Sequence, residues 1–140
     1  MLRYAIDVHG TLADRVPVGV TPSHLFPLLT GLMQAWVKQG DTVFILSGPP
    51  TAVIQQEIDS LGLRKDVHYT GVLSMVDYLR TRGEAMWEDP VGSDQWWATK
   101  EVWDAAKGWI ARQYWIDVVV DDTAAYRAAM PAATSFVLVG

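Results

Sequence analysis

The sequence contains no cysteine among its 140 residues, so disulfide bonds, a nucleophilic thiol and a thiolate metal site are all excluded. No apolar run approaches the roughly 20 residues that cross a bilayer. Met1 leads directly into an apolar segment, without the basic region and cleavage site of a signal peptide. We therefore expect a cytoplasmic protein with no membrane contact.

Basic residues are also scarce: 11 Lys and Arg stand against 16 Asp and Glu, and the formal net charge is −5. Nonspecific binding to nucleic acid needs clustered Lys and Arg, so we do not expect it. A small phosphorylated substrate can still bind an acidic protein if a divalent cation and one or two local cations offset the repulsion.

Half of the residues are hydrophobic and 19% are charged, which excludes a disordered chain. A chain of about 150 residues buries roughly 70% of its unfolded surface. We therefore expect residues 1–140 to form a single domain.

Apolar runs that are typical of buried strands alternate with segments whose apolar residues recur at helical spacing. The expected strands are 2–8, 43–46, 67–73, 114–120 and 134–139, and the expected helices are 22–40, 51–61, 74–81, 99–113 and 124–130. Residues 13–21 and 83–98 are expected to be loops. This alternation predicts an α/β fold with a parallel sheet and right-handed crossovers.

Polar side chains follow three of the expected strands: Asp7 after the first, Ser47 after the second, and Asp121 with Asp122 after the fourth. Open α/β folds bind ligands at this carboxyl edge of the sheet. A carboxylate placed there can act as a covalent nucleophile or as a ligand for a hard cation. Lys100 opens the helix that leads into the fourth strand.

The segment Asp7-Val8-His9-Gly10-Thr11 resembles the first motif of the haloacid dehalogenase-like (HAD) superfamily, whose phosphatases usually read Asp-x-Asp-Gly-Thr. Ser47, Lys100 and the Asp121-Asp122 pair resemble the remaining three motifs in the family's order. The resemblance covers nearly the whole chain. It implies a three-layer Rossmann-like (HAD-like) fold with about five parallel strands in the order 3-2-1-4-5. Residues 12–21 and 83–98 are too few for a folded cap domain, so a capless member is implied.

The resemblance also implies a chemistry. Asp7 would attack phosphorus and form an aspartyl-phosphate. Mg²⁺ would be held by the Asp7 carboxylate, the backbone carbonyl of His9 and a carboxylate from Asp121 or Asp122, of which we favour Asp122. The other residue of that pair would cap the following helix or hold the lysine.

The phosphoryl group would be bound by Thr11, by the hydroxyl of Ser47 and by the backbone N–H at Gly48. Lys100 would orient Asp7 and offset charge on the transferring group. Without the family resemblance, Ser47 could simply be part of a strand-to-helix turn. Lys100 could likewise be a solvated lysine in a first helical turn.

His9 stands where the family usually has a second Asp, which protonates the leaving alcohol and activates water. Imidazole has an unperturbed pKa of about 6.5 and can do both. Three outcomes are open: His9 replaces the acid/base, replaces it badly and leaves a slow enzyme, or belongs to a fold retained for binding. Our hypothesis is the first.

Trp87, Trp96 and Trp97 crowd the expected loop before Lys100. Tryptophan stacks well on bases and sugars, at about 1–3 kcal/mol per base, so a nucleotide or sugar phosphate is the expected substrate. Alternatively, these side chains pack beneath the loop or form a subunit contact, which would make the protein a homo-oligomer.

The sequence thus predicts a Mg²⁺-dependent phosphomonoester hydrolase. The main alternative is a catalytically impaired HAD-like binding or regulatory module. A phosphoacceptor domain resembling response-regulator receivers would carry its acidic pair after the first strand, and here the pair follows the fourth. No glycine-rich phosphate loop with Lys-Ser/Thr is present, which argues against a nucleotide kinase.

Overall fold

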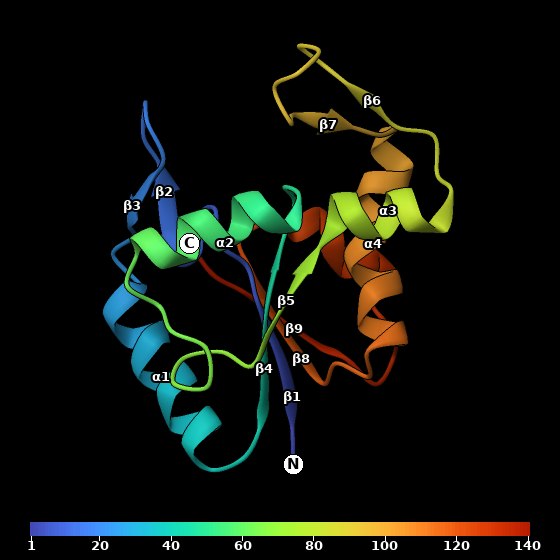
Figure 1. Cartoon of the computed structure of the whole chain (residues 1–140). Helices are drawn as coiled ribbons and strands as arrows, with labels where there is room; N and C mark the ends of the chain where they lie inside the picture. The colour runs from blue at the N-terminus through green and yellow to red at the C-terminus, as the bar shows by residue number, and fades with distance from the viewer.

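The computed structural model describes residues 1–140 and contains a central sheet of five parallel strands with helices on both faces (Figure 1). Its strands are β1 (Arg3–Ile6), β4 (Thr42–Ser47), β5 (Gly71–Ser74), β8 (Val118–Asp121) and β9 (Ser135–Leu138). They lie in the order β5-β4-β1-β8-β9. Counted along the chain within this sheet alone, that order reads 3-2-1-4-5. The labels differ from this count because four strands outside the sheet, which we did not expect, are numbered with the rest.

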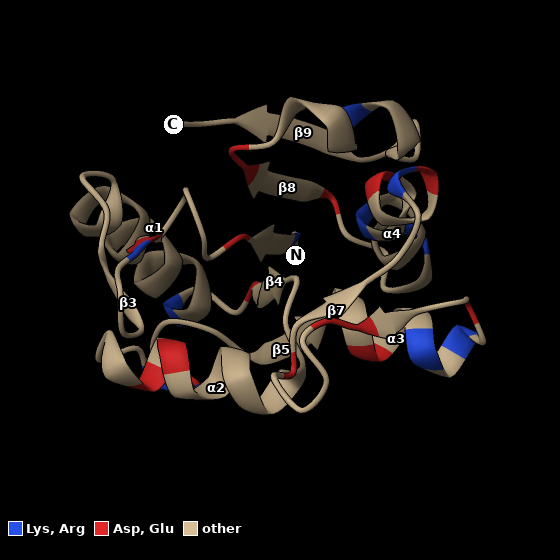
Figure 2. Cartoon of the chain, turned by 90° about the horizontal axis from the view of Figure 1, so that it is seen from above, with Lys and Arg blue, Asp and Glu red and all other residues tan.

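The helices form the outer two layers. They are α1 (Phe26–Lys38), α2 (Thr51–Ser60), α3 (Met75–Arg82), α4 (Lys100–Gln113) and the 3₁₀ helix η1 (Ala124–Ala129). Seen from above, α1 and α2 cover one face of the sheet, and α3 and α4 cover the other (Figure 2). None of the helices combines the length and apolar character that a membrane crossing requires.

Two hydrophobic cores lie on the two faces of the sheet. Ile6 and Ile45 belong to the core shared with α1 and α2, whereas Ala5 and Leu46 belong to the core shared with α3 and α4. Successive residues of a strand point to opposite faces, and both faces here are covered. This is why the central strands are continuous apolar runs.

The two segments expected to be loops are instead antiparallel hairpins. One pairs β2 (Ala13–Arg15) with β3 (Val20–Pro22), and the other pairs β6 (Trp87–Glu88) with β7 (Trp96–Trp97). Strands of two or three residues are too short to show an alternating pattern, so sequence periodicity does not reveal them. Both hairpins rise beyond the carboxyl edge of the central sheet (Figure 1).

Three expected boundaries are also shifted. The first helix begins at Phe26 rather than at Pro22, because the Ser23 hydroxyl accepts from the Leu25 N–H and donates to the Thr11 carbonyl. The fourth sheet strand begins at Val118, since Trp115 has a φ of +54° and interrupts the extended chain. The third begins at Gly71 and is only four residues long.

Candidate active site

Three neighbouring strands bring their carboxyl ends to one place. Ile6 pairs with Ile45 of β4 and with Val120 of β8, so the residues that follow them lie side by side. Asp7 comes directly after β1, Ser47 ends β4 and Asp121 ends β8. The structure therefore places Asp7, Ser47 and Asp121 at the same edge of the sheet, as expected for parallel strands.

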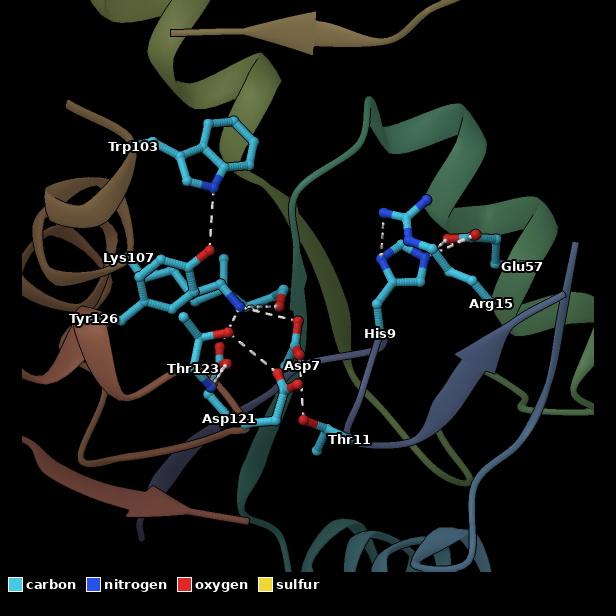
Figure 3. A network of polar contacts seen from close by, with 12 residues as sticks. Asp7, His9, Thr11, Arg15, Glu57, Trp103, Lys107, Asp121, Thr123 and Tyr126 are labelled. Carbon is cyan, nitrogen blue, oxygen red and sulfur yellow. Dashed lines mark hydrogen bonds and ion pairs between the residues drawn. The ribbon is translucent and has the colours of Figure 1, made fainter. Parts of the chain in front are cut away.

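The cation at the centre of this cluster is Lys107, which the sequence analysis did not identify. Its side chain is 2% exposed, and its Nζ donates to Asp7 Oδ1 at 3.0 Å, to the Leu46 carbonyl at 3.2 Å and to Asp121 Oδ2 (Figure 3). All three ammonium hydrogens thus have acceptors. An ammonium that is buried but fully hydrogen-bonded is the arrangement in which a protein interior tolerates a charge.

The prediction that Lys100 lies in this site is wrong. Lys100 is 78% exposed and pairs with Asp104 on its own helix. It opens α4, and its charge is solvated at the protein surface, as is common for lysines in a first helical turn.

Helical geometry explains this error. Seven residues make nearly two turns, so Lys100 and Lys107 lie on about the same face of α4, roughly 10 Å apart along its axis. Residue spacing therefore could not show which of the two lysines lies in the carboxylate cluster. The available signal was composition, because Lys107 stands among small and apolar residues (Ala105, Ala106, Gly108, Ile110 and Ala111). Such a lysine in an apolar helical stripe is expected to be buried.

Gly108 allows α4 to pack closely enough to bury Lys107. A Cβ on Gly108 would overlap the backbone carbonyl of Ala129 in η1. The absence of a side chain therefore lets α4 and η1 approach closely. Tyr126 of η1 lies over Lys107, with the ammonium 5.1 Å from the ring centroid.

The environment of Asp7 disfavours its charge. Burial, opposed by Lys107 and reinforced by the Asp121 carboxylate, raises the pKa of Asp7 from 3.8 to about 6. For Lys107, burial opposes the charge, but the carboxylates of Asp7 and Asp121 outweigh it and raise the pKa of the ammonium. The ammonium of Lys107 therefore stays charged, while the Asp7 carboxyl loses its proton at a higher pH than an ordinary aspartic acid.

Thr11 and Gly10 shape the loop after β1. Thr11 is fully buried, and its hydroxyl donates to Asp7 Oδ2 at 3.2 Å. Gly10 has a φ of +80°, and a Cβ there would overlap the carboxylate of Asp122. Glycine is therefore required at position 10 both for its backbone conformation and for the close approach of Asp122.

The carboxylates of Asp7, Asp121 and Asp122 fit a divalent cation, since one oxygen from each lies within 4.8 Å of the others. Three carboxylates against one ammonium leave negative charge that such a cation would offset. Asp121 is fully buried and already accepts from Lys107 and from the Thr123 N–H. Asp122 is exposed and accepts only from the Thr123 hydroxyl, at 3.3 Å, so it has the freer oxygens.

Two further groups beside these carboxylates lack partners. The Ser47 hydroxyl is buried and makes no hydrogen bond. The His9 carbonyl oxygen accepts none either. Buried polar groups are rarely unpaired, so the Ser47 hydroxyl is available to donate to a ligand oxygen. Gly48, next in sequence, packs against Trp103, whose ring would lie 3.1 Å from a Cβ at that position.

The His9 side chain belongs to a second network, on the α2 side of the site (Figure 3). Its Nε2 lies 3.0 Å and 2.9 Å from the two carboxylate oxygens of Glu57, and its Nδ1 lies 3.2 Å from an Arg15 guanidinium nitrogen. Nε2 therefore carries a hydrogen and donates to Glu57, while Nδ1 accepts from Arg15. Both ring nitrogens are engaged, and neither Glu57 nor Arg15 was expected from the sequence.

A cavity of about 710 Å³ adjoins the site and is lined by Trp96, Trp97 and Trp103. Trp87, the third tryptophan of the expected loop, is half-exposed and does not line it. Trp103 connects the cavity to the lysine, because its indole N–H donates to the Tyr126 hydroxyl at 3.0 Å.

No family model and no curated protein matches the chain. Among solved structures, it is similar to a chain of the Pnkp1/Rnl/Hen1 RNA repair complex, with a TM-score of 0.57 and 14% identity, over 98% of this chain and 42% of the solved one. A chain of a second Pnkp1/Rnl/Hen1 structure gives a TM-score of 0.46 and 12% identity, over 99% and 47% respectively. The chain thus spans less than half the length of the solved chains that it matches. At 14% identity the likeness shows a shared α/β fold and nothing about function.

Proposed function

We propose that this protein is a Mg²⁺-dependent phosphomonoester hydrolase of the HAD-like type without a cap domain, located in the cytoplasm, which acts through an aspartyl-phosphate on Asp7. The observation that carries the proposal is the orphaned, buried Ser47 hydroxyl at the end of β4, one residue after the Leu46 carbonyl that accepts from Lys107 of the Asp7 ion pair. The hydroxyl supplies a donor for a phosphoryl oxygen, the carboxylate a nucleophile and the ammonium a fixed positive charge.

The reaction divides into two displacements. An Asp7 oxygen attacks phosphorus, the bond from phosphorus to the ester oxygen breaks, and the leaving oxygen takes up a proton as the alcohol departs. Water then attacks the aspartyl-phosphate and releases inorganic phosphate, which regenerates the Asp7 carboxylate. Lys107 and Ser47 are preorganised to offset the charge that develops on the phosphoryl oxygens.

Magnesium is part of this proposal. Asp7, Asp122 and the His9 carbonyl would hold it, and Asp121 would position Lys107 instead. When bound, the cation would neutralise phosphoryl and carboxylate charge. The negative cluster and the freer oxygens of Asp122 support this assignment.

Under this proposal His9 is the acid/base that replaces the family's second Asp. Nδ1 is the nitrogen that would exchange a proton with the leaving group or with water, because Nε2 is held by both oxygens of Glu57. Arg15 must first release Nδ1. Arg15 is largely exposed, so its side chain is free to turn toward solvent.

The engagement of both His9 nitrogens also favours a second candidate function. If Arg15 stays on Nδ1, the leaving group has no imidazole acid, and the protein would be a HAD-like binding or regulatory module that holds metal and phosphate without efficient turnover. Metal binding without phosphate release would distinguish this function.

The experiment that tests the proposal is phosphate release from a panel of phosphomonoesters, with Mg²⁺ and with chelator, for the wild type and for Asp7→Asn. The panel holds nucleoside and sugar monophosphates, glycerol 3-phosphate and an oligoribonucleotide with a terminal phosphate. We include the oligoribonucleotide because a chain of similar fold belongs to an RNA repair complex.

We expect release that requires both Mg²⁺ and Asp7. Release that persists in Asp7→Asn or in chelator would come from a contaminant or from another chemistry. If the wild type binds Mg²⁺ but releases phosphate from none of these substrates, the result would favour the binding or regulatory module.

A further inference from the structure

The cavity of about 710 Å³ shares its walls with the site. Gly48 lines it directly after Ser47, and Arg15 lines it while its guanidinium contacts His9. A phosphate group held at Ser47 and Asp7 would therefore carry its ester oxygen toward this cavity. The cavity thus borders the proposed phosphate position on the side of Gly48 and Arg15.

The β6–β7 hairpin provides the wall opposite α2, and in Figure 1 it overhangs the carboxyl edge of the sheet. Within it, Trp97 is 51% exposed, and its indole N–H donates to the Asp89 carbonyl at 3.1 Å. This hydrogen bond holds the ring in position. Trp96 is already covered by the Arg80 guanidinium at 4.3 Å from its ring centroid. No stacked ring or guanidinium covers Trp97, which pairs with Trp87 across the hairpin, so the exposed half of its ring can stack on a flat ligand.

The charges around the cavity balance. Two cations, Arg15 and Lys100, are matched by two carboxylates, Glu57 and Asp94, and Lys100 also pairs with Asp104. A second phosphate on the leaving group would therefore meet no excess of positive charge. The cavity therefore suits an uncharged leaving group.

The size of the cavity and its aromatic lining further restrict which uncharged leaving groups fit it. Cavities of roughly 300–1,000 Å³ enclose ligands of drug size, which are larger than one sugar ring. Every nucleobase offers a flat face for an aromatic ring, whereas the polar lining residues Ser93 and Gln95 offer partners to hydroxyl or base-edge groups.

We propose that this cavity binds a nucleoside, so that the substrate is a nucleoside monophosphate with its phosphate at Asp7 and its base against Trp97. The assignment of the phosphate rests on the proposed function, but the nucleoside site itself does not.

Calorimetric titration of the wild-type protein with adenosine, guanosine, cytidine and uridine tests the site without any phosphate chemistry. At least one nucleoside should bind, and Trp97→Ala should weaken its affinity at least about fivefold. Trp97→Phe keeps an aromatic face and should restore affinity to within about threefold of the wild type. Trp115→Ala is the matched control, because Trp115 is 80% exposed and does not line the cavity. Trp115→Ala should bind the nucleoside with the affinity of the wild type.

Kinetics give the second measurement. Trp97→Ala should lower kcat/KM for nucleoside monophosphates, mainly through KM, and leave glycerol 3-phosphate unchanged. The inference is overturned if no nucleoside binds at millimolar concentration, or if Trp97→Ala binds as tightly as the wild type. Nucleoside binding without phosphate release from any ester would refute the proposed function and leave the site standing. Phosphate release that is equally fast from glycerol 3-phosphate and from nucleotides, and unchanged in Trp97→Ala, would support the proposed function and refute the nucleoside site.

Discussion

Lys107 Nζ lies 3.0 Å from Asp7 Oδ1, although 100 residues separate the two in sequence. The ion pair joins the middle of α4 to the end of β1, and β8, which carries Asp121, lies next to β1 in the sheet. The cluster exists only when the sheet and α4 are packed together. Its stability and its proposed chemistry therefore depend on the same contacts.

Replacing Lys107 should be the most damaging change in the site. Lys107→Met leaves the buried carboxylates of Asp7 and Asp121 without a cation, which should lower the free energy of unfolding by about 3 kcal/mol or more. It should also abolish phosphate release. Lys100→Ala is the matched control for stability, because this lysine is exposed and solvent screens its ion pair with Asp104, so the free energy of unfolding should change little. Urea denaturation and phosphate-release assays of both variants check this, and equal losses in the two variants would contradict it.

Asp7 should cost the protein stability at neutral pH. Its pKa rises from 3.8 to about 6 on folding, so its contribution to stability is fully present below about pH 4 and is lost as the pH rises through 6. Asp7→Asn removes this titration. In chelator at pH 8 the variant should be more stable than the wild type by about 1–3 kcal/mol, and at pH 4 the difference should shrink toward zero. Denaturation midpoints across this pH range test the sign; a variant that is less stable at pH 8 would refute it.

Ser47→Ala should separate stability from ligand binding. The buried hydroxyl has no partner, so its removal should leave the free energy of unfolding unchanged or raise it by up to about 1 kcal/mol. Because the variant lacks the donor proposed for a phosphoryl oxygen, it should bind inorganic phosphate several-fold more weakly. Competition by phosphate and urea denaturation measure the two effects. A large loss of stability would mean that the hydroxyl has a structural partner.

The two adjacent carboxylates should respond differently to neutralisation. Asp122→Asn should weaken Mg²⁺ binding at least about tenfold with little effect on stability, because Asp122 is exposed and lightly bonded. Asp121→Asn should mainly destabilise the fold, since Asp121 holds both Lys107 and the Thr123 N–H. Calorimetric titration with Mg²⁺ and thermal denaturation of each variant distinguish these roles. The reverse pattern would assign the metal to Asp121.

His9→Ala should reduce turnover far more than Mg²⁺ affinity. The proposed metal ligand at position 9 is the backbone carbonyl, which the variant keeps, while the imidazole acid/base is lost. A reduction in kcat of at least about a hundredfold is typical for a general acid/base. Steady-state kinetics and Mg²⁺ titration check this, and wild-type turnover in the variant would remove the imidazole from the mechanism.

The sequence by itself determined the α/β alternation and the positions of the polar strand ends. Asp7, Ser47 and Asp121 could be placed at one edge because apolar runs mark buried strands and parallel strands end at the same edge. These are local patterns, so they can be recognised in the sequence without knowing how the helices and strands pack.

Only the tertiary structure decided which lysine enters the cluster and what His9 contacts. Lys100 and Lys107 share a helical face, and Lys107 is the one that lies next to Gly108, where α4 approaches η1 closely. The Glu57 and Arg15 partners of His9 come from separate elements, α2 and β2. The two hairpins were also missed, because strands of two or three residues form from pairing across a turn and leave no periodic pattern. Contacts between distant segments depend on packing distances, and residue spacing along the chain does not encode these.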